Sequence, residues 1–191
     1  MFRLRILCLF ACALFAHASF GQSSLSAQLA AKRVTLPNGW KLSPHGKSVS
    51  LGDLPLNLAV SPNKAYIVAT NNGQSIQSLQ LFNVAKKEIV DSKEIPKSWY
   101  GLKIAGDNKT VYASGGNDNV ILVYHIEHDQ LVPKSKISLS ATPKAIISPA
   151  GLEIDEANKT LYVVTKDNNT LYAIDLVSEK VKESKFLLFR M

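Results

Sequence analysis

Short stretches in which hydrophobic and polar residues alternate recur along the chain, for example at residues 56–60, 100–104 and 151–154. Alternation places successive side chains on opposite faces of an extended backbone, so each stretch predicts a half-buried β-strand. After residue 32 no stretch sustains the helical spacing of hydrophobic residues between capping residues. One short helical turn is predicted at residues 24–32. The pattern therefore predicts an all-β protein.

The predicted strands belong to a unit that occurs three times. An Asn-Lys pair stands before an aromatic strand at Asn63, Asn108 and Asn158, which are separated by 45 and 50 residues. An alternating strand precedes each pair, and a polar turn, a second alternating strand and a strand rich in Ile, Val and Lys follow it. Four short strands in an antiparallel meander within about 45 residues are typical of a β-propeller blade. We therefore predict three blades, at residues 52–96, 97–140 and 141–191.

Three blades are fewer than the four to eight of closed propellers. The sequence therefore predicts an incomplete ring, in which each end blade has an uncovered apolar face. Residues 19–51 precede the first blade and contain strand and turn signals at Val34 and at Asn38-Gly39, which suggests a strand that closes the ring in the last blade. Two interpretations stay open: the chain is a fragment of a larger propeller protein, or a second copy completes the ring in a homo-oligomer.

The N-terminus has the features of a secretory signal peptide. Two arginines precede an apolar stretch over residues 6–16, and Ala16-His17-Ala18 forms a cleavage site of small residues. We predict cleavage after Ala18, which removes residues 1–18 and exports the product to the periplasm or the extracellular space. Because the apolar stretch is too short to span a bilayer stably, no integral membrane segment is expected in the product.

Cysteine content and charge narrow the classes of function. Cys8 and Cys12 are the two cysteines of the sequence and both lie in the segment to be removed, so no disulfide is expected. The formal net charge of the 191 residues is +7. The lysines are mostly single and interspersed with acidic residues, as on a solvated surface. Because a nucleic-acid partner needs a clustered basic face, we expect none.

Two segments resemble the YVTN-type β-propeller repeat of bacterial proteins. They are residues 161–176, which contain Tyr162-Val163-Val164-Thr165, and residues 66–72 of the first blade. Residues 36–40, 51–55 and 95–102 resemble, more narrowly, the N-terminal propeller of exported proteins that also carry a C-terminal phosphoesterase domain of the alkaline-phosphatase superfamily. The resemblance implies a propeller with a binding role. It assigns no catalytic residue, since the metal-binding and nucleophile motifs of those proteins belong to the other domain.

Four residues are candidates for a site at the propeller channel. Glu153 and Asp155 lie two apart on a predicted strand and so share a face, where carboxylates could bind a divalent cation as in lactonase-type propellers. The alternative is a solvated or lysine-paired role for both acids. Trp99 and Tyr100 begin the second blade and either border a ligand surface or pack between blades.

Other residues that bear chemistry are assigned to turns. His125 and His128 have a spacing that could begin a metal site, but the repeat places them at the third turn of the second blade. Ser61 and Ser148 precede blade turns and lack the surroundings of a nucleophile. We therefore predict no catalytic residue, no metal and no cofactor.

The function that the sequence favours is that of an exported, non-catalytic binding module, with an unidentified ligand or protein at the channel face. The alternative, from another class, is the propeller part of a phosphoesterase or a lactonase-like hydrolase.

Overall fold

The computed structural model describes residues 33–42, 47–140, 142 and 145–186. The predicted signal peptide, both cysteines and the helical turn predicted at residues 24–32 lie outside these residues. The chain divides into two compact units, Met1–Ser48 and Val49–Met191. The two units are described separately.

The described part of the first unit is a β-hairpin. β1 (Val34–Thr35) pairs antiparallel with β2 (Lys41–Leu42). Gly39 supplies the positive φ of the connecting turn, at +81°, as the Asn38-Gly39 signal predicted. Within the described residues β1 pairs only with β2, so the role of this segment as a ring-closing strand stays a prediction.

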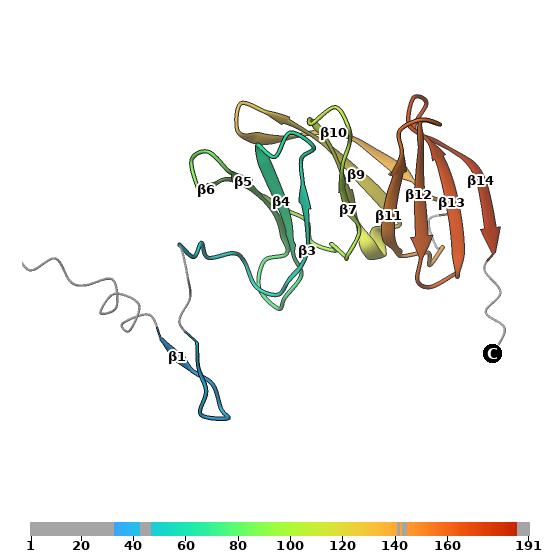
Figure 1. Cartoon of the computed structure of the whole chain (residues 1–191). Helices are drawn as coiled ribbons and strands as arrows, with labels where there is room; N and C mark the ends of the chain where they lie inside the picture. The colour runs from blue at the N-terminus through green and yellow to red at the C-terminus, as the bar shows by residue number, and fades with distance from the viewer. Residues whose placement is uncertain (1–32, 43–46, 141, 143–144, 187–191) are drawn as a thin grey trace, which may run out of the picture. The chain divides into compact units, whose positions relative to one another are not determined.

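The second unit consists of three four-stranded antiparallel sheets, which stand in succession in Figure 1 and are termed blades one, two and three. Blade one consists of β3 (Pro55–Val60), β4 (Tyr66–Asn71), β5 (Ser78–Asn83) and β6 (Glu88–Glu94). Blade two consists of β7 (Leu102–Ile104), β8 (Thr110–Ser114), β9 (Val120–Glu127) and β10 (Gln130–Ser138). Blade three consists of β11 (Pro149–Asp155), β12 (Thr160–Thr165), β13 (Thr170–Asp175) and β14 (Lys180–Phe186).

Each blade is a meander, because its strands pair in the order in which they occur along the chain. This arrangement confirms the predicted all-β class of three four-stranded blades. A single turn of 3₁₀-helix, η1 (Gly116–Asp118), connects β8 to β9 where a polar turn was predicted. It is the one helical element within the described residues.

The recurring Asn-Lys pair lies in the first turn of each blade, as predicted, and each of these turns has one residue in the left-handed region. These residues are Lys64, Asn108 and Lys159, with φ of 59°, 64° and 49°. Asparagine tolerates this conformation better than most residues. The lysines of blades one and three adopt it in the position directly after asparagine. In blade two the left-handed residue is therefore one position earlier in the repeat than in blades one and three.

Two hydrophobic cores lie between neighbouring blades. The core between blades one and two contains Val68 and Leu81 of blade one and Val111 of blade two. The core between blades two and three contains Tyr112 of blade two and Leu161 of blade three. Since Val111 and Tyr112 are neighbours on β8, the strand alternation divides the apolar residues of blade two between the two cores.

One cluster of polar contacts between blades one and two lies at the turns that join the third and fourth strands. Asp129, in the turn between β9 and β10 of blade two, accepts hydrogen bonds from blade one. The donors are the Tyr66 hydroxyl (2.6 Å), the Asn83 amide (2.8 Å) and the Lys86 ammonium (2.7 Å). The bond from Lys86, followed by those from Tyr66 and Asn83, holds the pKa of the Asp129 carboxyl well below its usual range. Asp129 therefore stays ionised and links blade one to blade two.

Candidate functional site

The innermost strands of the three blades, β3, β7 and β11, line one groove, which we term the inner groove. Its volume is about 640 Å³. β7 lies between β3 and β11 and contacts both, as Figure 1 shows. The inner strands face the channel in a propeller, so this groove lies where the sequence predicted a binding face. The residues that line it include Asn57, Tyr100, Lys103, Glu153 and Glu156, which bear its polar groups, and the backbone of β3 around Leu58 and Val60.

An ion pair crosses the inner groove from blade two to blade three. The Lys103 ammonium on β7 lies 2.8 Å from Oε2 of Glu153 on β11. The hydrogen bond from Lys103 is the main reason why the pKa of Glu153 is lowered, and the backbone N–H of Ile154 adds to this effect. Both side chains are partly exposed, so the pair adds little to stability. Because of this ion pair, the inner groove has a positively charged and a negatively charged group next to each other.

Asp155 belongs to a turn. Its carboxylate accepts hydrogen bonds from the backbone N–H (3.0 Å) and the side-chain amide (2.8 Å) of Asn158, in the first turn of blade three. These bonds lower the pKa of Asp155. Of the two acids that the sequence placed on one face, Glu153 is among the residues that line the inner groove and Asp155 is not. Because Asp155 is the last residue of β11, its carboxylate stabilises the first turn of blade three and does not face the inner groove.

Tyr100 lies on the wall of the inner groove and is half exposed, at 52%. Its backbone carbonyl accepts a hydrogen bond of 2.9 Å from the side-chain amide of Asn57, which connects the start of blade two to β3 of blade one. The phenol itself is no member of the two cores described above. A large apolar ring with a polar hydroxyl therefore stands free at the edge of the groove.

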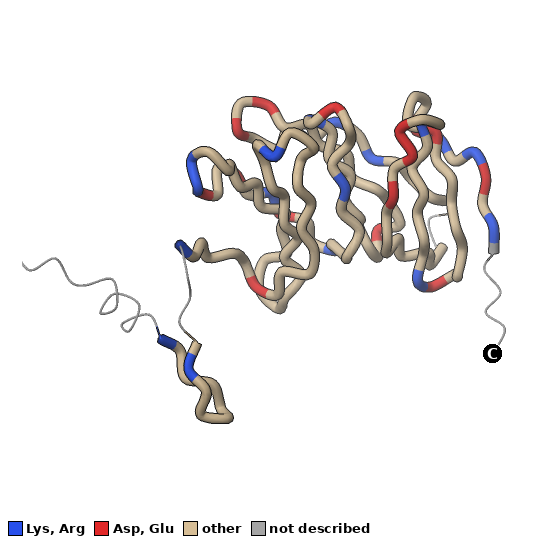
Figure 2. The backbone as a smooth tube through the Cα atoms, in the orientation of Figure 1, with Lys and Arg blue, Asp and Glu red and all other residues tan. Residues whose placement is uncertain are grey.

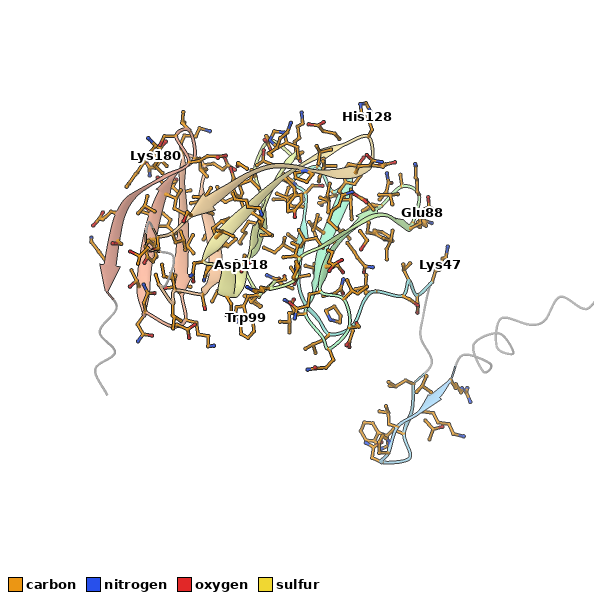
Figure 3. All side chains as sticks on the ribbon, turned by 180° about the vertical axis from the view of Figure 1, so that it is seen from behind. Lys47, Glu88, Trp99, Asp118, His128 and Lys180 are labelled. Carbon is orange, nitrogen blue, oxygen red and sulfur yellow. The ribbon has the colours of Figure 1, made fainter. Side chains whose placement is uncertain are left out.

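Trp99 lies away from the inner groove. The ammonium of Lys166 stands 5.5 Å from the centre of its ring, a cation–π contact between blades two and three. Figure 3 places Trp99 beside Asp118 at one end of the blades, and His128 at the opposite end. The side chain is exposed and belongs to neither core. Trp99 thus makes a contact between blades two and three and does not line the inner groove, and its role as a ligand-binding residue stays a prediction.

Lys103 and Asn57 were missed as site residues by the reasoning from sequence. A signal for Lys103 was present, however. Lys103 pairs with Tyr112 and Glu153 pairs with Tyr162, so the two residues occupy the same position of the repeat in successive blades. Superposing the repeats would have placed opposite charges on neighbouring inner strands.

His125 was predicted at the third turn of blade two but lies within β9, paired with Val132 of β10, because β9 continues to Glu127. His128, Ser61 and Ser148 lie in turns or next to strand ends. His125 is on β9, with Nδ1 3.5 Å from Glu127, and His128 adopts a φ of 50° in the turn that follows. Ser61 is buried, and its hydroxyl donates to Asn63. Ser148 is buried too, and donates to Asp167. Across the part of the chain that the structure describes, no group of three or more His, Cys, Asp or Glu side chains is placed to hold a metal ion.

No family model and no curated protein matches the sequence. Solved structures do match the chain. The WD40 repeats of RRP9 match with a TM-score of 0.55 at 16% identity, over 74% of this chain and 40% of that chain. The β-propeller domain of Cps50 (Swd1) from Myceliophteria thermophila matches with a TM-score of 0.57 at 12% identity, over 71% of this chain and 44% of that chain. The three sheets are β-propeller blades.

A third match is hydrazine synthase from Kuenenia stuttgartiensis, with a TM-score of 0.55 at 26% identity, over 68% of this chain and 36% of that chain. The blades described here thus span less than half the length of each of these three structures. At identities this low the first two matches establish the propeller fold alone. No helix among the described residues is long and apolar enough to cross a membrane.

Proposed function

We propose that this chain is an exported, non-catalytic β-propeller module of the YVTN type, which binds a ligand or a protein partner in the inner groove as part of a larger propeller. The signal-peptide features of residues 1–18 support export. The Tyr162-Val163-Val164-Thr165 segment on β12 supports the YVTN assignment.

The observation that carries the binding role is the inner groove itself. It is a concave surface on which polar groups of three blades converge, and convergent polar groups in a concave surface are a common feature of ligand sites. Here Tyr100 offers an exposed aromatic ring, and Lys103 and Glu153 offer one charge of each sign. A zwitterionic or neutral ligand with an apolar part fits these groups better than a polyanion.

Two features support a non-catalytic role over the hydrolase alternative. The carboxylate of Glu153 is neutralised by Lys103, and that of Asp155 is held by Asn158. A cation site in the channel would need both carboxylates free to point at one ion. Basic and acidic residues are also interspersed over the three blades (Figure 2), which supports a partner other than nucleic acid.

A thermal-shift screen tests the proposed binding. The chain without residues 1–18 is heated with a panel of sugars, peptides, nucleotides and phospholipid headgroups. At least one class is expected to raise the melting temperature, because a ligand that binds only the folded state stabilises it. Tyr100→Ala keeps the backbone carbonyl that Asn57 uses and is expected to lose most of the shift.

The matched control is Val177→Ala, which removes an exposed apolar side chain after β13, away from the inner groove. This variant should respond like the parent chain. A panel in which every stabilising compound acts equally on the parent chain and on Tyr100→Ala would contradict binding in the inner groove.

A further inference from the structure

Each blade has a forward face, toward the next blade along the chain, and a rear face, toward the preceding one. The strand registers show which residues of different blades are equivalent. Leu58, Leu102 and Leu152 occupy one position of the rear face, since they pair with Ala69, Ala113 and Val163 on the neighbouring strands. The exposed fraction is 2% for Leu102 and 8% for Leu152, but 61% for Leu58. A leucine that is buried at both contacts between blades is thus uncovered on blade one.

On the forward face, a position that is buried in blades one and two is uncovered in blade three. Val68, Tyr112 and Tyr162 are equivalent, since they pair with Ala59, Lys103 and Glu153 on the innermost strands. Val68 is fully buried and Tyr112 is 6% exposed, whereas Tyr162 of blade three is 37% exposed. Val164, two residues further along β12 and on the same face, is also exposed. The described blades therefore end in two apolar faces, each with the residue pattern of a contact between blades.

From these two faces we propose that the forward face of blade three binds the rear face of blade one in a second copy of this chain. The proposal deepens the proposed function by naming what completes the propeller. It does not depend on whether the inner groove binds a ligand.

A second copy is the occupant favoured by the continuity of the contacts. The rear face of blade two packs on the forward face of blade one, and the rear face of blade three packs on the forward face of blade two. The uncovered rear face of blade one, with Leu58, is built like the rear faces that blades two and three already bury. The uncovered forward face of blade three and the uncovered rear face of blade one therefore have the same residue pattern as the two faces that meet at each existing contact.

The outer strands of blades one and three also carry acids at equivalent positions. At the existing contact the outer strand of blade one supplies an acid, Asp91, which accepts a hydrogen bond of 2.7 Å from the Leu131 N–H of blade two. Glu183 holds the equivalent position on blade three, since Asp91 pairs with Leu81 and Glu183 with Ala173. Within the described residues the ion pair of Glu183 is with Lys185 of its own strand.

The third turn of blade one is basic where those of blades two and three are acidic. It carries Lys86 and Lys87, whereas the other two turns carry Asp129 and Glu179. Asp129 receives donors from blade one, and Glu179 receives the Ser135 hydroxyl of blade two at 2.9 Å. In the single chain Lys86 already donates to Asp129 of blade two, and Asp175, at the position that Asn83 holds on blade one, is already paired with Lys182 at 2.9 Å.

Two copies joined in this way form a ring of six blades. This number lies within the four to eight of closed propellers. A two-fold arrangement makes the contact twice and leaves no end face open, whereas a single contact of this kind would continue into a filament. The proposal therefore predicts a closed dimer.

Size-exclusion chromatography with light scattering, on the chain without residues 1–18, tests the dimer. The expected mass is twice that of one chain. Leu58→Glu and Val164→Glu each place a charge on one of the two faces, at positions exposed in the single chain, and each should weaken the dimer by ~100-fold or more. Lys136→Glu, on the exposed outer strand of blade two, is the control and should leave the dimer intact.

Mixing the two variants gives the decisive result. A Leu58→Glu chain and a Val164→Glu chain together restore one contact in which both faces are unaltered, so the mixture should form a heterodimer that neither variant forms alone. A parent chain that is a folded monomer, as expected if further blades of a longer polypeptide cover these faces, would overturn the proposal. So would a mixture that stays monomeric, or an open series of larger species.

Discussion

Replacing Leu161 with alanine is expected to lower the free energy of unfolding by ~2–5 kcal/mol, the range for removing a fully buried leucine. Leu161 is completely buried on β12, in the core between blades two and three. The truncated side chain would leave a cavity lined by residues of two blades, which the rigid strand pairing on both sides prevents from collapsing. Urea unfolding followed by circular dichroism measures the loss.

Val177→Ala is the control for this prediction, because Val177 is 81% exposed. Its effect should stay within about 0.5 kcal/mol, as is usual for surface positions. A cost below about 1 kcal/mol for Leu161→Ala would mean that blades two and three do not pack through this side chain.

Gly101→Ala is expected to destabilise the chain by ~1–3 kcal/mol, the usual cost of overpacking. A Cβ atom at Gly101 would lie 2.6 Å from the backbone carbonyl oxygen of Ala150 and 2.8 Å from Cγ of Leu152. Both residues are on β11 of blade three, and a backbone oxygen cannot rotate away as a side chain can. The two blades must therefore separate locally to admit one methyl group.

Gly106→Ala is the matched control for Gly101→Ala. The nearest atoms to a Cβ at Gly106 belong to the flexible side chain of Glu156, at 3.2 Å. We expect a smaller loss, of about 1 kcal/mol or less. Equal losses in the two variants, measured by urea unfolding, would contradict a close approach of the blade two and blade three backbones at Gly101.

The repeated pattern of strands and turns could be predicted from sequence because it is local. Alternation and the Asn-Lys turns each depend on a few neighbouring residues, and these recur at Asn63, Asn108 and Asn158. The class of fold follows from the length of the unit and its four strands. The structure confirms the class and adds the two cores between blades.

The site was harder to predict, because it depends on how strands of different blades face one another. For Glu153 the sequence left open a cation site shared with Asp155 or a lysine-paired role, and in the structure its carboxylate is paired with Lys103 of the preceding blade. Strand periodicity assigned Asp155 to the same face as Glu153. Asp155 is the last residue of β11, however, and its carboxylate accepts a hydrogen bond from Asn158 in the turn that follows. Trp99 precedes β7, outside the periodic stretch, so no pattern fixed its surroundings.

Hydrogen–deuterium exchange with and without a stabilising compound from the screen tests the central claim, that the inner groove is the binding surface. Binding there should slow exchange of backbone amides in β3, β7 and β11, together with the segment around Tyr100, more than elsewhere in the chain. Protection confined to the outer strands β6, β10 and β14, with the inner strands unchanged, would contradict the account.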